Sequence, residues 1–464
     1  MAEVETDIVA EAMPDLSRAL VVDARRTFPL VRLRERVANT FWLLPFAFLV
    51  GALFLVWLTR VVDKGLPPAG QAWSYIVWNN GSATTVLSTI ATAMLAFLGV
   101  VFSITLVAMQ LASQQFSPRV LRTYVRSSIT KVALGTFIAT FIYPLLSLSW
   151  VGRREDASGT VVSLSAFVAL VLVLASCIVF IAFVNNTVSL MRITYSIRRV
   201  AAETRHAFRQ MFPPESAYVS VEVPALDERV YSTLFRKPDW SLAAARADHG
   251  VILGADVGLL TCIAREHDCV LRARVQVGDY VGLGEPIIDT YARPGLDSTR
   301  PTDAELLRAY DIGPERTVYQ DPLYGIRELV DVAAQALSPA VNAPTTAVQV
   351  IDRLQDILRQ VASAPDQTGL YADEDGVVRL IGEIRTWDEV VDLALTEIRE
   401  FGASSPQVTR RLSALIETLL QVVPERRRAA LERHSELLRL AVGRAVSDGK
   451  PAEFALQPDR KGLG

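Results

Sequence analysis

The chain is 464 residues long, carries a formal net charge of −3 and contains three cysteines. This length exceeds one ordinary domain, and three cysteines are too few for the disulfide framework of a small secreted protein. A net charge so close to zero gives no sign of a nucleic-acid partner, and we expect none.

Four stretches before residue 192 are almost free of charge and long enough to cross a bilayer. A membrane-spanning helix needs about 20 mostly apolar residues, and these stretches contain no Asp, Glu, Lys or His and only Arg60 near one end. They cover residues 41–62, 84–112, 132–151 and 160–191. The sequence therefore predicts a multi-pass membrane protein, with an N-terminal segment at residues 1–40 and a four-span domain at residues 41–212.

Basic residues gather on one side of the predicted bilayer, which sets the expected orientation. They precede the first span, lie between the second and third spans, and follow the fourth span at Arg192, Arg198, Arg199 and Arg205. We therefore expect both termini in the cytoplasm of a bacterium and the spans in its cytoplasmic (inner) membrane, in contact with the lipid bilayer. The basic residues after the fourth span suit either anionic lipid or an anion-selective vestibule.

The second span carries small or polar residues at three- and four-residue steps, which place them on one helical face. Large apolar residues such as Leu87, Met94 and Val101 occupy the opposite face. A small, hydroxyl-rich face suits either close packing against another helix or the lining of a water-filled path. On the second reading, the candidate pore-lining residues are Thr85, Ser88, Thr92, Ala96, Gly99, Ser103 and Gln110.

The spans contain no carboxylate, so the groups that usually relay protons or coordinate cations in pumps are missing from the membrane interior. Energised transport is therefore not expected. After the fourth span, no Gly or Pro occurs before Pro213. This predicts one extended helix over residues 160–212 that joins the membrane to the tail.

In residues 213–300 the pattern changes to short alternating runs that are separated by Gly and Asp. This pattern predicts a small β-rich, barrel-like module. The expected strands cover residues 217–223, 250–253, 258–263, 270–277 and 286–291. Residues 275–287 look like part of a lipoyl or biotinyl module, but no Lys lies between Lys237 and Lys450 to carry such a group. We expect no cofactor.

A metal site is also considered, because Cys262, His267 and Cys269 lie close together in the sequence. A structural zinc site normally needs four ligands in paired short spacings. The chain offers no second pair, so no metal site is expected.

Beyond residue 300, apolar residues at three- to four-residue steps predict a helical bundle over residues 301–464. The fold class is thus a four-span α-helical membrane domain plus a cytoplasmic α+β region. Two of the later helices are joined by a linker whose Pro339, Asn342 and Pro344 suit a turn and a helix start. Alternatively, polar residues near this linker bind an ion or a small solute. The candidates are Asp321, Arg327, Asp331, Asn342 and Thr345.

Three segments resemble a family of bacterial predicted membrane proteins catalogued as a domain of unknown function. Residues 102–119 read FSITLVAMQLASQQFSPR, residues 320–327 read QDPLYGIR, and residues 336–347 read ALSPAVNAPTTA. The resemblance covers nearly the whole chain and implies a membrane topology without an established activity. Family members commonly have an Asp where this chain has Ala343. Any ligand role of that Asp carboxylate in the family therefore does not carry over to this chain.

No recognisable motif joins a nucleophile, a base and an orienting group, and the four histidines are scattered. We therefore expect no enzyme. Two classes of protein remain: a passive ion channel or pore with a cytoplasmic vestibule or gating domain, and a membrane-anchored scaffold or ligand sensor without transport activity. A homo-oligomer is expected in both, since a polar stripe needs burial. The stripe favours the channel, because a scaffold does not require one.

Overall fold

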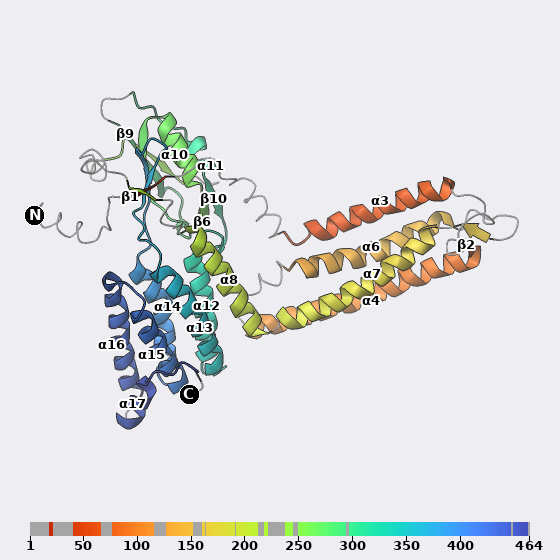
Figure 1. Cartoon of the computed structure of the whole chain (residues 1–464). Coiled ribbons are helices and arrows are strands. Elements are labelled where there is room, and N and C mark those ends of the chain that lie inside the picture. The colour runs from red at the N-terminus through yellow and green to blue at the C-terminus, as the bar shows by residue number, and fades with distance from the viewer. Residues whose placement is uncertain are drawn as a thin grey trace, which may run out of the picture. The chain divides into compact units, whose positions relative to one another are not determined.

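A computed structural model gives the architecture and describes residues 18–21, 40–65, 77–115, 127–151, 160–162, 164–190, 192–211, 218–220, 237–244, 249–293, 297–446 and 449–462. The chain folds into two compact units. The first, which we call the membrane unit, is Leu33–Ser196, and the second, the tail unit, combines Met1–Arg32 with Ile197–Gly464. Figure 1 labels the elements of each unit.

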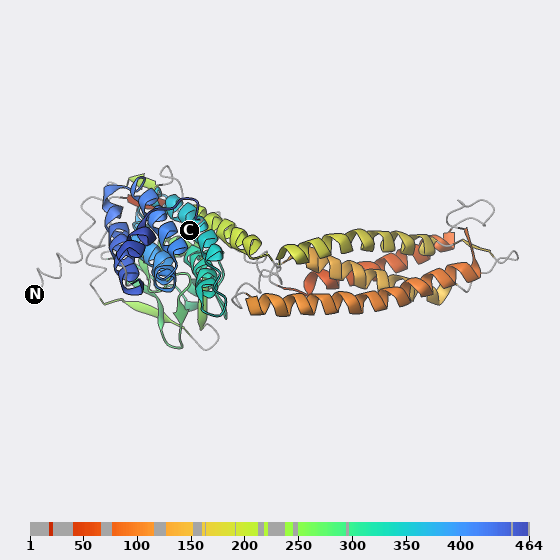
Figure 2. The ribbon, with the colours of Figure 1, turned by 90° about the horizontal axis from the view of Figure 1, so that it is seen from below.

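The membrane unit is a bundle of long helices that run side by side in Figures 1 and 2. They are α3 (Leu43–Gly65), α4 (Asn80–Gln115), α6 (Ser128–Val151) and α7 (Leu164–Leu190). Each contains an apolar stretch long enough to cross a membrane, so the four predicted spans are confirmed. The strands β2 (Val77–Asn79) and β3 (Thr160–Val162) pair antiparallel before α4 and α7.

Helix α6 is the best-buried of these helices and packs against the other three. Its Phe137 is fully buried. The hydroxyl of Tyr143 donates to Thr59 Oγ1 on α3 over 3.1 Å. The hydroxyls of Thr140 and of Ser176 on α7 lie 2.7 Å apart. These buried hydroxyls of Tyr143 and Thr140 thus find partners across helices, which avoids the cost of an unsatisfied polar group in hydrocarbon.

The single helix predicted over residues 160–212 is instead two helices, α7 and α8 (Ile193–Met211). Between them, the N–H of Arg192 donates to the carbonyl of Ser189 over 3.1 Å, three residues back rather than four. Helix α7 is apolar on all sides, as suits a span, whereas α8 is amphipathic and buries one face in the tail unit. The two helices therefore suit different surroundings, lipid for α7 and the tail unit for most of α8. The boundary between the two units falls after Ser196, in the first turn of α8.

The tail unit contains a seven-stranded sheet and a three-stranded sheet among its described residues. The first has the order β4 (Tyr218–Ser220), β1 (Arg18–Val21), β11 (Leu370–Ala372), β12 (Val378–Ile381), β7 (Cys269–Ala273), β9 (Pro286–Ala292) and β5 (Trp240–Ala243). The second has the order β10 (Tyr310–Gly313), β6 (Gly250–Ala255) and β8 (Tyr280–Val281). Strands from residues 213–300 thus share sheets with strands from residues 310–381, and the expected boundary at residue 300 does not separate a β-rich part from a helical part.

The strand β1 belongs to the expected N-terminal segment of residues 1–40, most of which lies outside the described residues. It pairs parallel with β11, with Leu20 opposite Tyr371, and antiparallel with β4. Residues before the first span and after the last span therefore lie in one sheet. An even number of membrane crossings is required for this, which agrees with four spans.

One expected strand is a helix. Residues 258–263 lie in α10 (Val257–Glu266), whose first turn is capped by the carboxylate of Asp256, which accepts from the N–H of Leu259 over 3.0 Å. A short apolar run fits a buried strand and a buried helix equally well. Here the cap favours the helix, and Leu260 and Ile263 are buried in the core formed with Leu271.

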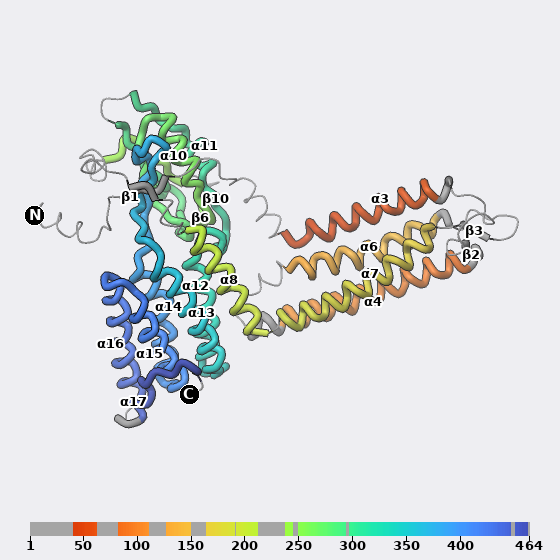
Figure 3. The backbone as a smooth tube through the Cα atoms, in the orientation of Figure 1, coloured from red at the N-terminus to blue at the C-terminus, as the bar shows by residue number. Residues whose placement is uncertain are grey.

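The helices of the tail unit beyond residue 300 agree with the predicted periodicity, and Figure 3 traces their path. They are α11 (Asp303–Arg308), α12 (Pro322–Leu337), α13 (Pro344–Ala362), α14 (Trp387–Gly402), α15 (Pro406–Leu420), the 3-10 turn η5 (Glu425–Arg427), α16 (Arg428–Ala445) and α17 (Gly449–Leu456). Proline occupies the first position of α12, α13 and α15, where its missing N–H costs nothing.

Helix α8 is held in the tail unit by α12 and α13. At Gly325 of α12 a Cβ atom would overlap the hydroxyl of Thr204 and come within 2.9 Å of its Cβ. Arg205 of α8 makes two contacts with α13. Its guanidinium pairs with Asp356 over 3.5 Å, and its carbonyl accepts from Gln360 over 3.2 Å. A glycine is therefore required where the two helices cross.

Helices α14 and α16 are joined by His434, a histidine that is only 1% exposed. Its Nε2 lies 2.7 Å from Asp392 Oδ1 and its Nδ1 lies 3.1 Å from Arg399 Nη1. Because Arg399 can only donate, Nδ1 must accept, and Nε2 carries the proton that is donated to Asp392. Burial lowers the pKa of His434, and the folded protein holds the ring neutral.

We predict that Gly325→Ala lowers the stability of the protein by about 1–3 kcal/mol, because the added methyl group overpacks the contact with Thr204. The apparent melting temperature of the full-length protein in detergent measures this. Adding Thr204→Ala should recover part of the loss. The matched control is Gly443→Ala in α16, where nothing lies within 4 Å of the added atom and helix propensity predicts a gain of roughly 0.5–1 kcal/mol. Equal effects at both glycines would contradict the close-packing account.

We also predict a loss of stability in mild acid that His434 causes. Its folded pKa lies below the unfolded value near 6.5, so its contribution is complete above about pH 6.5 and is lost as the pH falls toward the folded pKa. The melting temperature should fall less between pH 7.5 and 5.5 in His434→Gln than in the wild type. His206→Gln on the exposed face of α8 is the control and should follow the wild type. An unchanged pH profile in His434→Gln would refute this assignment.

Candidate functional site

The candidate pore-lining residues of α4 face away from the bundle to which α4 belongs. Six of the seven are exposed and Ser88 is half-buried. The opposite face, which includes Leu87, Met94 and Val101, is buried against the other helices. The small, hydroxyl-rich face is therefore not packed within one chain. The exposed members are Thr85, Thr92, Ala96, Gly99, Ser103 and Gln110.

The surroundings of this stripe leave room for a partner. At Gly99 nothing lies within 4 Å of an added Cβ atom. The hydroxyl of Ser88 donates to the carbonyl of Thr85 over 3.0 Å, so its proton is used within the helix while its oxygen lone pairs stay available. The stripe can thus meet another helix, or present acceptor oxygens to water or a cation.

Sequence reasoning missed a second polar stripe, on α6. Thr136, Thr140, Tyr143 and Ser147 follow one another at steps of four, three and four residues, the same spacing that singled out α4, and all are buried. The hydroxyl of Ser147 has no hydrogen-bond partner among the described residues. Periodicity in the sequence could have revealed this stripe, but it could not have told which stripe turns inward.

Polar groups also meet at the start of α6. The amide of Asn186 on α7 donates to Ser127 Oγ over 3.0 Å and lies 3.4 Å from Thr130 Oγ1. Lys131, which the sequence placed in a loop between spans, lies in the first turn of α6, is 5% exposed and donates to the carbonyl of Thr40 over 3.1 Å. These bonds tie the starts of the first and third spans to the end of the fourth.

The five ligand candidates of the tail unit do not form one site. Asp321 precedes α12, whereas Asn342 and Thr345 lie beyond its other end and are exposed. The 16 residues of α12 separate the two groups by about 24 Å at 1.5 Å per residue. The structure brings only Arg327 and Asp331 together, over 2.8 Å.

Arg327 connects two helices of the tail unit. Its guanidinium pairs with Asp331 one turn later and, through both terminal nitrogens, with Glu397 of α14. The hydrogen bond to Glu397 raises the pKa of Arg327. All three side chains are committed to one another, which fits a structural role.

Asp321 caps α12 by accepting from the N–H of Tyr324 over 3.1 Å. Burial raises the pKa of its carboxyl group. A Cβ atom on Gly278, whose φ is +97°, would overlap that carboxylate, and the carbonyl of Gly278 accepts from Arg316 over 2.6 Å. Asn342 has a φ of +44° and serves the tight turn that its linker position predicted. Capping and turn geometry thus account for the residues of the linker motif.

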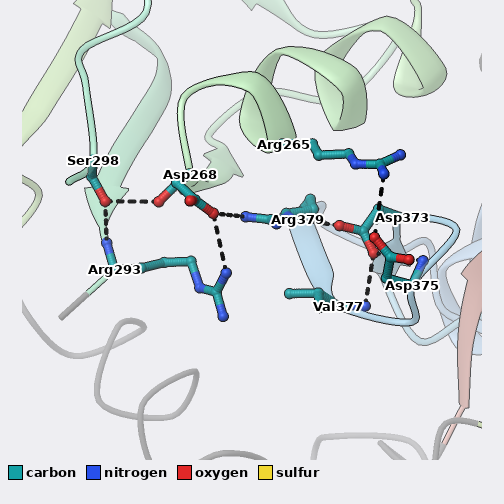
Figure 4. Close-up of polar contacts among 8 residues, drawn as sticks. All are labelled: Arg265, Asp268, Arg293, Ser298, Asp373, Asp375, Val377 and Arg379. Carbon is teal, nitrogen blue, oxygen red and sulfur yellow. Dashed lines mark hydrogen bonds and ion pairs between the residues drawn. The ribbon is translucent and has the colours of Figure 1, made fainter. Parts of the chain in front are cut away.

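A cluster of charged residues in the tail unit surrounds Arg379, which is 6% exposed (Figure 4). Its Nε lies 2.7 Å from Asp373 and its Nη1 lies 3.1 Å from Asp268. Arg293 adds a second contact to Asp268 over 3.3 Å, and the hydrogen bond with Arg379 lowers the pKa of Asp268. Each charge has an opposite partner, so the cluster fastens the turn before β7 to the hairpin of β11 and β12.

The Cys and His residues considered for a metal lie in α10, just after its end, and at the start of β7. Cys269 is fully buried, and burial raises the pKa of its thiol to about 12, which disfavours the thiolate that binds metals. His267 Nδ1 lies 2.7 Å from Thr299 Oγ1. Within the described ranges, no group of three or more His, Cys, Asp and Glu side chains could hold a metal ion.

Comparisons with known proteins agree with the membrane architecture. A family model described as "Predicted membrane protein (DUF2254)" matches residues 38–418. Uncharacterized protein Rv1290c of Mycobacterium tuberculosis is 29% identical over 377 residues, which cover 79% of this chain and 70% of the relative. Uncharacterized protein Mb1321c of Mycobacterium bovis matches with the same identity and coverage. No solved structure matches the chain.

Proposed function

We propose that this chain, which belongs to the DUF2254 family of predicted membrane proteins, is a homo-oligomer that lets ions pass passively through the bilayer. In this proposal the α4 helices of several copies surround a central path, and the tail units form a vestibule or gate at one end. We propose conduction rather than catalysis.

The orientation of the α4 stripe carries the proposal. Helix α7 exposes large apolar side chains such as Ile178 and Ile181, each 70% exposed, as a lipid-facing surface does. Helix α4 also exposes large apolar side chains such as Leu106, 59% exposed, but it adds a stripe that includes Thr92, Gly99 and Ser103. Small and hydroxyl-bearing side chains suit a face that meets another helix or water.

Large exposed side chains flank the stripe, which supports assembly around it. Leu95 is 58% exposed and Val100 is 55% exposed, and both lie beside Gly99 on the helix surface. In a ring of copies such side chains would pack against neighbours while the small residues face the axis. Helix α4 has 36 residues and is about 54 Å long, which exceeds the hydrocarbon thickness of about 30 Å.

Passive conduction is inferred from the charges of the spans. Their apolar stretches contain Arg60 and Lys131, both toward the ends, and no carboxylate. A coupled transporter usually places carboxylates in the membrane interior. We further propose the bacterial inner membrane with both termini in the cytoplasm, supported by the flanking basic residues and by the shared sheet of β1 and β11.

A membrane-anchored scaffold or sensor is the alternative. Tyr280 and Leu283, near the turn between β8 and β9, are 68% and 62% exposed, which suits contact with a partner protein. A scaffold or sensor needs no path through the membrane, so a measurement of ion flux distinguishes it from a channel.

We predict that Gly99→Leu abolishes or reduces ion flux at least tenfold in proteoliposomes while leaving insertion and assembly intact. Within one chain nothing lies within 4 Å of a Cβ atom added at Gly99. An effect of the substitution on flux would therefore come from the path or the neighbouring copies that face the stripe. Cation and anion fluxes are measured separately.

The matched control is Gly51→Leu, which adds the same side chain at an exposed glycine of α3 that also has nothing within 4 Å. It should conduct like the wild type. Wild-type flux in an assembled Gly99→Leu protein would remove α4 from the path. No flux in the assembled wild type would favour the scaffold.

A further inference from the structure

The basic residues of α8 and its approach fall into two sets. Arg199 pairs with Glu203 over 3.0 Å, and Arg205 pairs with Asp356 over 3.5 Å. Arg192, Arg198 and Arg209 have no ion pair with any residue that the structure describes. Most arginines of the tail helices that follow, by contrast, have a carboxylate partner.

Two of these arginines, Arg198 and Arg209, share one face of α8 with an aromatic residue. Tyr195, Arg198, Ala202, His206 and Arg209 are all exposed, and at 100° per residue they fall within an arc of about 80°. The opposite face is buried in the tail unit. Its members are Ile197, Val200, Ala201, Thr204, Ala207 and Phe208. The exposed arc of α8 therefore carries positive charge and no carboxylate. We call it the basic face.

The basic face begins a few residues after the fourth predicted span. Arg192 follows the end of α7 at Leu190 by two residues, and Tyr195, 38% exposed, lies one turn farther on. Tyrosine and arginine are the residues that favour the headgroup region next to a span. Chain connectivity alone thus brings the first turns of α8 within reach of lipid headgroups.

We propose that the basic face binds the phosphate groups of anionic phospholipids. A guanidinium group presents two parallel N–H donors to phosphate oxygens. Arg198 and Arg209 are exposed and have no carboxylate partner among the residues that the structure describes, which leaves these donors available. The buried face fixes α8 on α12 and α13, so the side chains that bind lipid project from a rigid support. This site is independent of the proposed conduction path.

The test uses the full-length protein in detergent, with mixed phosphatidylglycerol and phosphatidylcholine as the probe. Native mass spectrometry counts the retained lipids. Arg198→Gln/Arg209→Gln should lower the ratio of phosphatidylglycerol to phosphatidylcholine at least threefold. Arg428→Gln/Arg439→Gln removes the same charge from arginines of α16 that have carboxylate partners and is the matched control, which should retain the ratio of the wild type. Arg198→Lys/Arg209→Lys should keep most of it, because the charge remains.

Each outcome decides the assignment. Equal preference in the wild type and Arg198→Gln/Arg209→Gln, with both proteins folded by circular dichroism, would overturn it. An equal loss in both glutamine pairs would also overturn it, since general charge would then suffice. Competition by inorganic phosphate at millimolar concentration, with no preference for lipid, would reassign the face to a soluble anion. Flux need not be measured, so failure here leaves the proposed conduction untouched.

Discussion

The close crossing of α8 and α12 fastens the helix that follows the fourth span to the tail unit. A span is satisfied by hydrocarbon on all sides, but the chain that leaves it has to find a polar environment within a few residues, and an isolated helix in water is marginal. Helix α8 solves this by burying Val200, Thr204 and Phe208 in the tail unit. The absence of a side chain at Gly325 lets the backbones approach, and the pairs that Arg205 makes fix the register. The close crossing of the two helices therefore explains the motif around Gly325 without a ligand.

The parts of the fold that the sequence predicted are those governed by local chemistry. Spans follow from the absence of charge, and the start of α13 follows from Pro344. The parts that it did not predict depend on pairings between distant residues. Residues 258–263 form a helix because Asp256 caps it and the sheet core accepts it. Arg327 reaches Glu397 from another helix, so its neighbours in the sequence could not show that its charge is already used.

The two polar stripes of the membrane unit likewise show that the sequence predicts candidate site residues but not what surrounds them. Thr92, Gly99 and Ser103 on α4 have a spacing much like that of Thr136, Tyr143 and Ser147 on α6, yet one stripe points outward and the other inward. Periodicity shows that a helix has two different faces but not which of them the bundle covers. That choice is made by the large side chains: Leu87 and Val101 of α4 fill the bundle, and Phe137 of α6 fills it from the other side. The outward stripe is consequently a property of the assembled bundle.

The place of β1 in the tail sheet has a consequence for the order of folding. Leu20 leaves the ribosome before any span, but it pairs with Tyr371, which is synthesised after all of them. The sheet between β4 and β11 cannot be completed until the four helices have entered the membrane and the chain has returned to the same side. Such a distant pairing forms late and slowly, and until then β11 lacks one of its neighbours. Closure of this sheet thus has to wait until Tyr371 has been synthesised, and it requires a chain that has crossed the bilayer an even number of times.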